Sequence, residues 1–504
     1  MTAQKLALRR VRHSQAALWY GHCFSCVNKN EIGCEKEGLI ESFSLGRYAS
    51  VGRLLIIAAS AATALALGVL VAYFEFGLRE VLIILFGGVA VIALLAPLDS
   101  VLQFGLGLGI ASIGLGWRTV TFTGALTFAP FEVIIWALAI VLTLRSVLRR
   151  ERLVLDLSMP LVAFVLWCAL VLVRGLVSEV RWDVTLGFGK QMLLILPFFL
   201  VMRNLVRDMR VWRRMILVAT GTALYLSLTG LLVYLVPDMA SPLGEWLGVE
   251  TFKVGNFERV GFPGWGPLAA WYFAPLFGLL LGFWNSADSG YRQFGYTLIL
   301  FILGAAILVS GQRGAWVALL AGMVVYSMFD MRRGLVLSAL SLLIIFAVPA
   351  SDVVLRLESA FNPALFDSSA ADRYARADRA WSALRESPFF GLGFGVHTYT
   401  HSDFLEIGVA AGVVGMALFV WTLGMTAKQL WQTSIVQYNA TSRKLAQGAF
   451  VMFVILAVEL LSSGFVTLSF TAVVIWFLWS MADQYAFIAK KGMPAVSSPE
   501  PRLP

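Results

Sequence analysis

Apolar residues occur along the chain in long runs, separated by short polar segments that hold most of the charge. A run of about 20 apolar residues is long enough to cross the hydrocarbon core of a bilayer as a helix. The pattern predicts about twelve to fourteen such helices, because the runs near Pro97 and Gly464 are short for a span. The predicted spans are Arg53–Phe74, Val81–Pro97, Leu98–Leu115, Phe131–Leu148, Leu157–Val173, Leu186–Val201, Met215–Val236, Trp265–Trp284, Phe294–Ser310, Gly314–Phe329, Gly334–Ala350, Phe404–Ala427, Ala449–Leu461 and Val466–Met481.

The spans also divide the chain into regions. We expect an N-terminal extension at 1–50, transmembrane helices at 51–350 with one larger loop at 237–264, a long loop at 351–402, further transmembrane helices at 403–487 and a disordered tail at 488–504. Long loops between membrane helices tend to carry function. The loops at 237–264 and 351–402 are therefore the first places to look for chemistry.

The basic residues predict how the chain is oriented. The strongly basic short loops are Arg145–Arg152, Arg203–Arg214, Met331–Arg333 and Lys428–Lys444. They fall on one side of the membrane if every predicted span crosses once, and short loops rich in Lys and Arg remain in the cytoplasm. We therefore expect both termini to be cytoplasmic and the two long loops to lie on the outer face.

Composition excludes a soluble globular protein. The chain is 59% hydrophobic and 14% charged, with a mean hydropathy of +0.80. A soluble domain carries roughly 25% charged residues. The net charge of +9 arises from the loop clusters described above. We therefore expect membrane lipids around the protein and no nucleic-acid partner.

Three of the four cysteines lie in the polar N-terminal extension. His22, Cys23 and Cys26 form an H-C-x-x-C pattern that Cys34 follows. Such ligands suit zinc, but the spacing does not match a known finger. We favour an unstructured extension without metal over a zinc site. The fourth, Cys168, lies within an apolar run and is expected to be a small core residue.

The long loop contains arginines that recur mostly at three-residue steps. This spacing predicts a helix with a basic face and an apolar face. Guanidinium groups bind phosphate or pyrophosphate in a bidentate manner. The alternative is a solvated surface helix whose arginines pair with nearby aspartates. The arginines are Arg373, Arg376, Arg379 and Arg385, the apolar residues Trp381 and Leu384, and the aspartates Asp372 and Asp378.

A histidine immediately precedes the next predicted span. Thr400 and Asp403 have capping-box spacing, which places His401 in the first turn of that helix. A helix amino terminus disfavours an imidazolium, and a neutral histidine accepts a proton from a hydroxyl. His401 is thus a candidate catalytic residue, with His397 as a second candidate. The alternative is an interfacial histidine that only hydrogen-bonds the backbone.

Other charged residues lie near the outer ends of predicted spans. Arg313 occupies a turn between two spans, where an arginine should face water, an anion or a carboxylate. Arg259 lies among aromatic residues that suit sugar stacking. Lys190 either snorkels to the interface or adds to the same positive field. Glu132 and Glu459, within spans, are expected to make hydrogen bonds between helices.

Several catalytic motifs are missing from the sequence. It has no D-x-D, P-loop, H-E-x-x-H or G-x-S-x-G motif. The glycines Gly391, Gly393 and Gly395 neither follow a strand nor open a helix, which excludes a nucleotide-binding loop. If the protein is a transferase, arginines rather than a metal must stabilise a leaving phosphate.

Four stretches together resemble a known family. They are RVGFPGWGPLAAW, SGQRGAW, DRYARADRAWSALRESPFFGLGFGV and HSDFLEIGVAAGVVG. They resemble motifs of the O-antigen ligase/polymerase superfamily and occur in its order, from Arg259 to Gly415. The turn departs from the family by having Gln312 where serine is common, and the cysteine-bearing extension has no counterpart.

The resemblance implies a fold and an activity. The fold would be an all-α transmembrane bundle of GT-C-like architecture in the bacterial inner membrane. The activity would be a metal-independent glycosyltransferase without a cofactor, active at the periplasmic face. Its donor would be a glycan on undecaprenyl pyrophosphate, contacted by Arg313 and Arg259. Arg373 best matches the family's loop arginine, with Arg376 and Arg379 in competition, and His401 would act near the acceptor hydroxyl.

The acceptor distinguishes the remaining alternatives. A ligase transfers the glycan to lipid A-core, whereas a polymerase transfers it to a second lipid-linked glycan. The long loop lacks the R-x10-G pattern frequent in polymerases, which favours a ligase slightly. A membrane transporter is the alternative of another class. It calls for ionisable residues at mid-bilayer and paired broken helices, whereas the charges here gather at the outer face.

Overall fold

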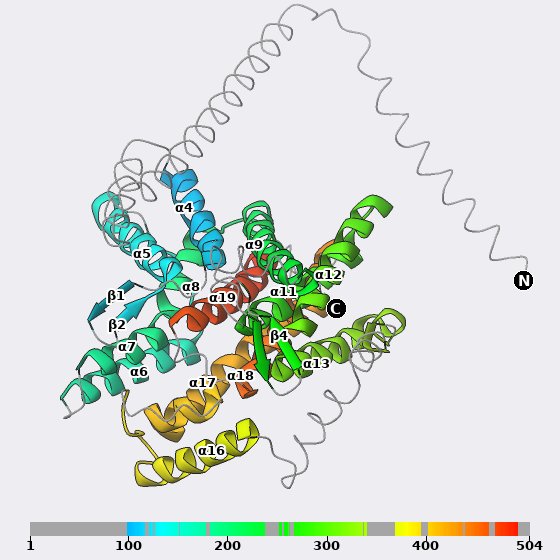
Figure 1. Cartoon of the computed structure of the whole chain (residues 1–504). Coiled ribbons are helices and arrows are strands. Elements are labelled where there is room, and N and C mark those ends of the chain that lie inside the picture. Colours follow the sequence, from blue (N-terminus) through cyan, green and yellow to red (C-terminus); the bar gives the residue numbers. More distant parts are fainter. Residues whose placement is uncertain are drawn as a thin grey trace, which may run out of the picture. The chain divides into compact units, whose positions relative to one another are not determined.

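The apolar runs form helices because a chain within a bilayer must satisfy its backbone hydrogen bonds internally. Figure 1 shows the resulting bundle in a computed structural model. The structure describes residues 98–115, 120–123, 126–150, 152–177, 182–236, 251–254, 257–260, 262, 267–335, 337–339, 368–394, 402–436, 439–462 and 469–491. The predicted spans before Leu98, most of Gly334–Ala350, the cysteine-bearing extension and the part of the predicted tail beyond Lys491 lie outside these residues, whereas residues 488–491 of that tail belong to α19.

The described chain is helical apart from two hairpins. The helices are α4 (Leu98–Ser112), α5 (Pro130–Arg149), α6 (Met159–Val177), α7 (Trp182–Leu193), α8 (Ile195–Leu205), α9 (Met209–Leu235), α11 (Ala270–Ser286), α12 (Gly290–Val309), α13 (Arg313–Phe329), α16 (Ser368–Glu386), α17 (Asp403–Val436), α18 (Ala440–Ser462) and α19 (Ser469–Lys491). Short 3-10 helices are η1 (Ile113–Leu115) and η3 (Pro267–Ala269). The antiparallel hairpins pair β1 (Val120–Thr123) with β2 (Leu126–Phe128) and β3 (Thr251–Val254) with β4 (Phe257–Val260).

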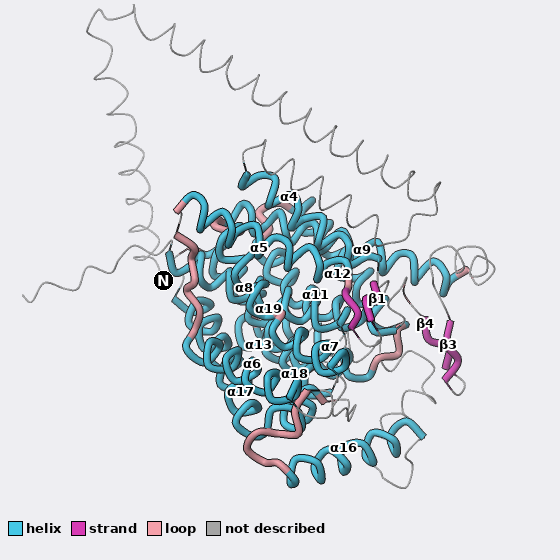
Figure 2. Tube along the Cα trace, turned by 90° about the vertical axis from the view of Figure 1, so that its left-hand side faces the viewer, coloured by secondary structure: helices cyan, strands magenta, loops and turns pink. Residues whose placement is uncertain are grey.

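Eight segments of the described chain are long and apolar enough to cross a membrane, and α13 is a shorter apolar helix. The predicted all-α transmembrane bundle is therefore confirmed. The hairpins were not predicted, and both lie in connections between helices (Figure 2). The total number of spans stays a prediction, since several predicted runs are outside the described residues.

One predicted span lies within a single apolar segment, Trp182–Leu205, that has a junction between two helices inside it. The run predicted as Leu186–Val201 is split into α7 and α8 at Leu194. Pro197 explains the split, because proline lacks an N–H and its ring clashes with the carbonyl four residues earlier. That carbonyl belongs to Leu193, the last residue of α7.

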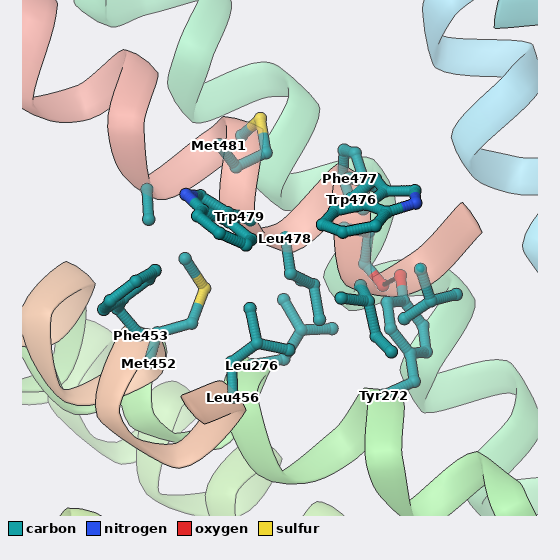
Figure 3. Close-up of a cluster of buried hydrophobic side chains, with 14 of the residues drawn as sticks. Tyr272, Leu276, Met452, Phe453, Leu456, Trp476, Phe477, Leu478, Trp479 and Met481 are labelled. Atoms are coloured by element: carbon teal, nitrogen blue, oxygen red, sulfur yellow. Dashed lines mark hydrogen bonds between the residues drawn. The ribbon is translucent and has the colours of Figure 1, made fainter. Parts of the chain in front are cut away.

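Helix α19 supplies much of the aromatic core. Trp476 and Trp479 are fully buried, and Figure 3 shows them among side chains of α11 and α18. Beside them α11 and α18 approach closely because glycines face each other. A Cβ on Gly448 would lie 2.7 Å from the carbonyl oxygen of Leu279, and one on Gly282 would lie 2.7 Å from that of Lys444. Small residues at such crossings allow tight packing in membranes.

Ring contacts establish the direction of the helices around this core. Phe329 and Trp431, near the carboxyl ends of α13 and α17, have centroids 5.5 Å apart, so α13 and α17 run parallel. Trp431 also contacts Phe450, in the first half of α18 (Ala440–Ser462), with centroids 5.3 Å apart. Helix α18 is therefore antiparallel to α17, and α11 is antiparallel to α18 through the glycine contacts.

Candidate functional site

The amino ends of α13 and α17 lie at the same end of the bundle. Helix α6 runs antiparallel to α17, since Phe164 lies against Phe419 and Trp167 lies against Ala411. The carboxyl end of α6 and the amino end of α11 are therefore at this end too. We call it the site end, because most of the predicted functional residues in the described chain are located there.

The turn before α13 has a defined hydrogen-bonded shape. Gly311 has a φ of +64°, and the N–H of Gln312 donates to Ser310 Oγ over 3.2 Å. The indole of Trp316 donates to the Ile307 carbonyl over 2.9 Å, which ties α13 back to α12. Arg313 is the first residue of α13 and is partly buried. The turn thus fixes where the backbone of Arg313 lies.

The strand that carries Arg259 lies at the same end. In the hairpin, Arg259 of β4 is paired with Phe252 of β3. Phe262, shortly after β4, is fully buried and packs edge-on against Phe273 of α11, with centroids 5.1 Å apart. A Cβ on Gly230 of α9 would lie 2.4 Å from the Phe262 ring, so α9 also holds this residue closely. Phe262 therefore anchors the hairpin to the amino end of α11.

Helix α16 packs on α17 at the edge of the bundle (Figures 1 and 2). Ala380 and Ala383 are buried together with Val409 of α17, and Leu384 is also buried, which confirms an amphipathic helix. The prediction that Trp381 belongs to the apolar face was wrong, because Trp381 is 49% exposed and is not part of the buried face. Leu384 was correctly placed on the apolar face.

The arginines of α16 do not share one face. Steps of three residues drift around a helix of 3.6 residues per turn. Position 373, two turns before Ala380, lies on the face packed against the protein. Arg376 is partly buried and pairs with Asp372 at 2.7 Å, whereas Arg379 and Arg385 are exposed. Arg376 is therefore less exposed than Arg379 and Arg385, and the choice among Arg373, Arg376 and Arg379 as the loop arginine that matches the family stays a prediction.

Helix α17 is kinked near the site end. Gly412 has a φ of +72° and a ψ of −179°, which is not helical. The segment after α16 closes onto this kink: the N–H groups of Leu392 and Gly393 donate to the carbonyls of Val409 (2.7 Å) and Ala410 (3.0 Å). The glycines of the GLGFG stretch therefore make a backbone contact with α17, a role that the sequence did not reveal.

The first turn of α17 carries two buried carboxylic acids. Asp403 is 0% exposed and Glu406 is 5% exposed. Neither was singled out from the sequence as a candidate site residue, because their spacing resembles ordinary amino-terminal capping. His397, Thr400 and His401 lie outside the described residues, so their roles stay predictions.

Lys190 forms an ion pair within the helices. Its Nζ lies 2.5 Å from Glu132 Oε1, and it also lies over the ring of Phe128 at 4.3 Å. The other oxygen of Glu132 accepts from the backbone N–H of Ala129 over 3.3 Å. The predicted helix–helix role of Glu132 is confirmed, and Lys190 has a structural partner. Whether Lys190 also contacts a substrate stays a prediction.

Basic residues at the opposite end also have partners. Arg203 of α8 lies 2.5 Å from Asp483 of α19 and donates to Gln484 over 2.9 Å. Arg333 bonds Asn285, whose carbonyl also accepts from Lys444 over 2.8 Å. These contacts join α8 to α19 and α11 to α18 at that end. Across the described ranges, no group of three or more His, Cys, Asp or Glu residues is arranged to hold a metal ion.

The fold and its spans define a multi-pass membrane protein. Residues 298–420 match the model of the O-antigen ligase family, Wzy_C, so this part of the chain is similar to that family. The matched segment contains Arg313, α16, the stretch after α16 that closes onto the kink and the first part of α17. A comparison with curated proteins finds no match to the chain.

Proposed function

We propose that the protein is a glycosyltransferase that moves a glycan from undecaprenyl pyrophosphate to an acceptor at the periplasmic face, as an O-antigen ligase does. The observation that carries this proposal is the match over residues 298–420. That segment contains the turn with Arg313, the helix with the loop arginines and the start of α17.

The donor pyrophosphate is the group that the arginines would hold. Arg313, β4 with Arg259, and α16 share the site end of the bundle. In this proposal Arg313 and Arg259 contact the pyrophosphate, and Arg373 with Arg376 approaches it from α16. Guanidinium groups stabilise the charge that develops on the leaving phosphate in a site that excludes water.

The acceptor hydroxyl would be activated by His401. In the sequence this residue stands two positions before Asp403, the first residue of α17. The histidine takes the hydroxyl proton while the acceptor oxygen attacks the anomeric carbon, and undecaprenyl pyrophosphate leaves. Arg379 and His397 would contribute less directly, because Arg379 is exposed and His397 precedes the helix by several residues.

A deletion strain tests the reaction and separates the two acceptors. Loss of polysaccharide from lipid A-core, with chains of normal length left on the carrier lipid, is the result expected for a ligase. Single repeats on lipid A-core would instead identify a polymerase. Unchanged surface and carrier-linked glycans, after complementation controls, would overturn the proposed function.

A further inference from the structure

A tryptophan outside the matched domain contacts the kink of α17. Trp167 lies in the middle of α6, and its Nε1 donates a hydrogen bond to the carbonyl oxygen of Ala411 over 2.8 Å. Its ring is stacked on Phe390, with centroids 5.2 Å apart and planes inclined by 17°. One side chain therefore contacts both α17 and the segment that follows α16.

The kink requires donors of this kind. Because Gly412 interrupts the helix, the carbonyls of the preceding turn lose N–H groups that a continuous helix would supply. The carbonyls of Val409 and Ala410 receive backbone N–H groups from the segment after α16. The carbonyl of Ala411 receives the indole N–H of Trp167. Beyond the kink, the N–H of Val413 donates to the carbonyl of Pro388 over 2.7 Å.

The two backbones are too close for any residue but glycine. A Cβ on Gly412 would lie 2.1 Å from the carbonyl oxygen of Phe389, and a Cβ on Gly391 would lie 2.5 Å from Ala410. Gly391 has a φ of +68°, a conformation that other residues rarely adopt. We call Pro388–Phe394 together with the kink the clasp.

The clasp lies between α16, which carries the loop arginines, and α17, whose first turn follows His401 in the sequence. Helix α16 ends at Glu386, two residues before Pro388, and α17 starts at Asp403, two residues after His401. Arg174 of α6 also reaches the clasp, donating to the Gly391 carbonyl over 3.3 Å. A change in the angle at Gly412 would therefore move the start of α17 relative to the part of α17 beyond the kink and to the bundle that packs on it.

We propose that Trp167 is a positioning residue for glycan transfer: its indole N–H fixes the kink of α17 and thereby the place of the first turn of α17, which follows His401 in the sequence, relative to Arg313 of α13. This inference rests on the proposed function for its catalytic consequence. Trp167 itself touches neither donor nor acceptor in this account. It should therefore affect the rate of transfer and leave donor affinity nearly unchanged.

The test compares two tryptophans that make the same kind of bond. Trp167→Phe keeps a ring for stacking on Phe390 and removes the N–H. Trp212→Phe is the matched control, since the buried Trp212 indole donates to the Met481 carbonyl over 3.0 Å in the part of the bundle away from the clasp. We expect Trp167→Phe to lower kcat by about tenfold, with KM for the donor within about twofold. Trp212→Phe should lower Tm by about as much as Trp167→Phe does. Its kcat should nevertheless stay within about twofold of that of the wild-type protein. Equal kcat in the two variants, or an effect of Trp167→Phe on KM alone, would overturn the inference.

A distance measurement tests the clasp without any transfer assay. Nitroxide labels are placed at exposed positions of α16 and of α17 beyond the kink, through Arg385→Cys and Trp421→Cys in a protein whose native cysteines are serine. Trp167→Phe should shift or broaden the distance distribution, and Trp212→Phe should not. An unchanged distribution in Trp167→Phe would refute the positioning role. Failure of the wild-type protein to transfer glycan would refute the proposed function. The distance distributions would still show whether Trp167 holds the kink of α17 in place.

Discussion

The ammonium group of Lys190 lies 2.5 Å from a carboxylate oxygen of Glu132, which joins α7 to α5 at the site end of the bundle. The Glu132 side chain is 0% exposed and that of Lys190 is 11% exposed. A charged pair so placed is held by its own attraction and by the Ala129 N–H. Removing one member leaves the other charge buried without a partner.

Lys190→Met should therefore destabilise the protein, by about 3 kcal/mol if the loss resembles that of other buried pairs. The double variant Glu132→Gln with Lys190→Met should recover part of that loss, since no lone charge remains. Thermal unfolding in detergent or nanodiscs measures both. A Lys190→Met protein with an unchanged Tm and slower transfer would instead assign Lys190 to the substrate.

Arg313→Ala should abolish surface glycan assembly at normal protein abundance. We expect transfer to fall by more than about 100-fold, because the arginine would stabilise the leaving pyrophosphate. Arg259→Ala should behave similarly. The matched control is Arg385→Ala, which removes an exposed arginine of α16 and should leave the glycan intact. A normal amount of surface glycan in the Arg313→Ala strain would show that Arg313 is not needed to stabilise the leaving pyrophosphate.

Within α16, the face of the helix on which an arginine lies should determine whether that arginine contributes to donor binding. By helical spacing, position 373 lies on the face of α16 that carries the buried Ala380, whereas Arg379 is exposed. We expect Arg373→Ala to raise KM for the donor by at least about tenfold, and Arg379→Ala to change it by less than about twofold. Kinetics over a range of donor concentrations check this order. The reverse order would place the donor on the outer side of α16.

His401→Ala should slow the chemical step and leave donor binding intact. Loss of a general base typically costs about 100-fold to 10,000-fold in rate. Binding of the lipid-linked donor, measured separately by titration, should remain close to that of the unchanged protein. A variant that binds donor weakly but retains kcat would contradict a role in accepting the hydroxyl proton.

Chelation of divalent metal should leave transfer unaffected, because arginines supply the positive charge in this account. The assay is a transfer reaction run with and without excess chelator. Inhibition that added divalent cation reverses would contradict the metal-independent mechanism.

Sequence alone predicted the apolar helices well, because long apolar runs in a membrane protein have few other folds open to them. Helix α6, for example, spans Met159–Val177 where the sequence predicted Leu157–Val173. The span predicted at Leu186–Val201 is also present, as Trp182–Leu205, and only the junction of α7 and α8 at Leu194 was not predicted. Amphipathicity of α16 was predicted, but three-residue steps were taken as one basic face, which the 3.6-residue turn does not preserve.

The clasp was not predictable from the sequence. Gly412 stands in a run of small apolar residues where any glycine would look alike, and only its φ of +72° marks the kink. Trp167 lies in an apolar run as an ordinary core residue would. Its partner, the Ala411 carbonyl, is 244 residues away in the chain and carries no side-chain signal. Backbone pairing between distant segments depends on the fold rather than on residue type.

The central claim is most directly tested with purified protein in nanodiscs, an undecaprenyl-pyrophosphate-linked glycan and lipid A-core as acceptor. The account predicts glycan on lipid A-core together with an equal amount of free undecaprenyl pyrophosphate. It also predicts that Arg313→Ala reduces both products by more than about 100-fold. A folded preparation that releases no undecaprenyl pyrophosphate, either with lipid A-core or with a second lipid-linked glycan as acceptor, would contradict the claim.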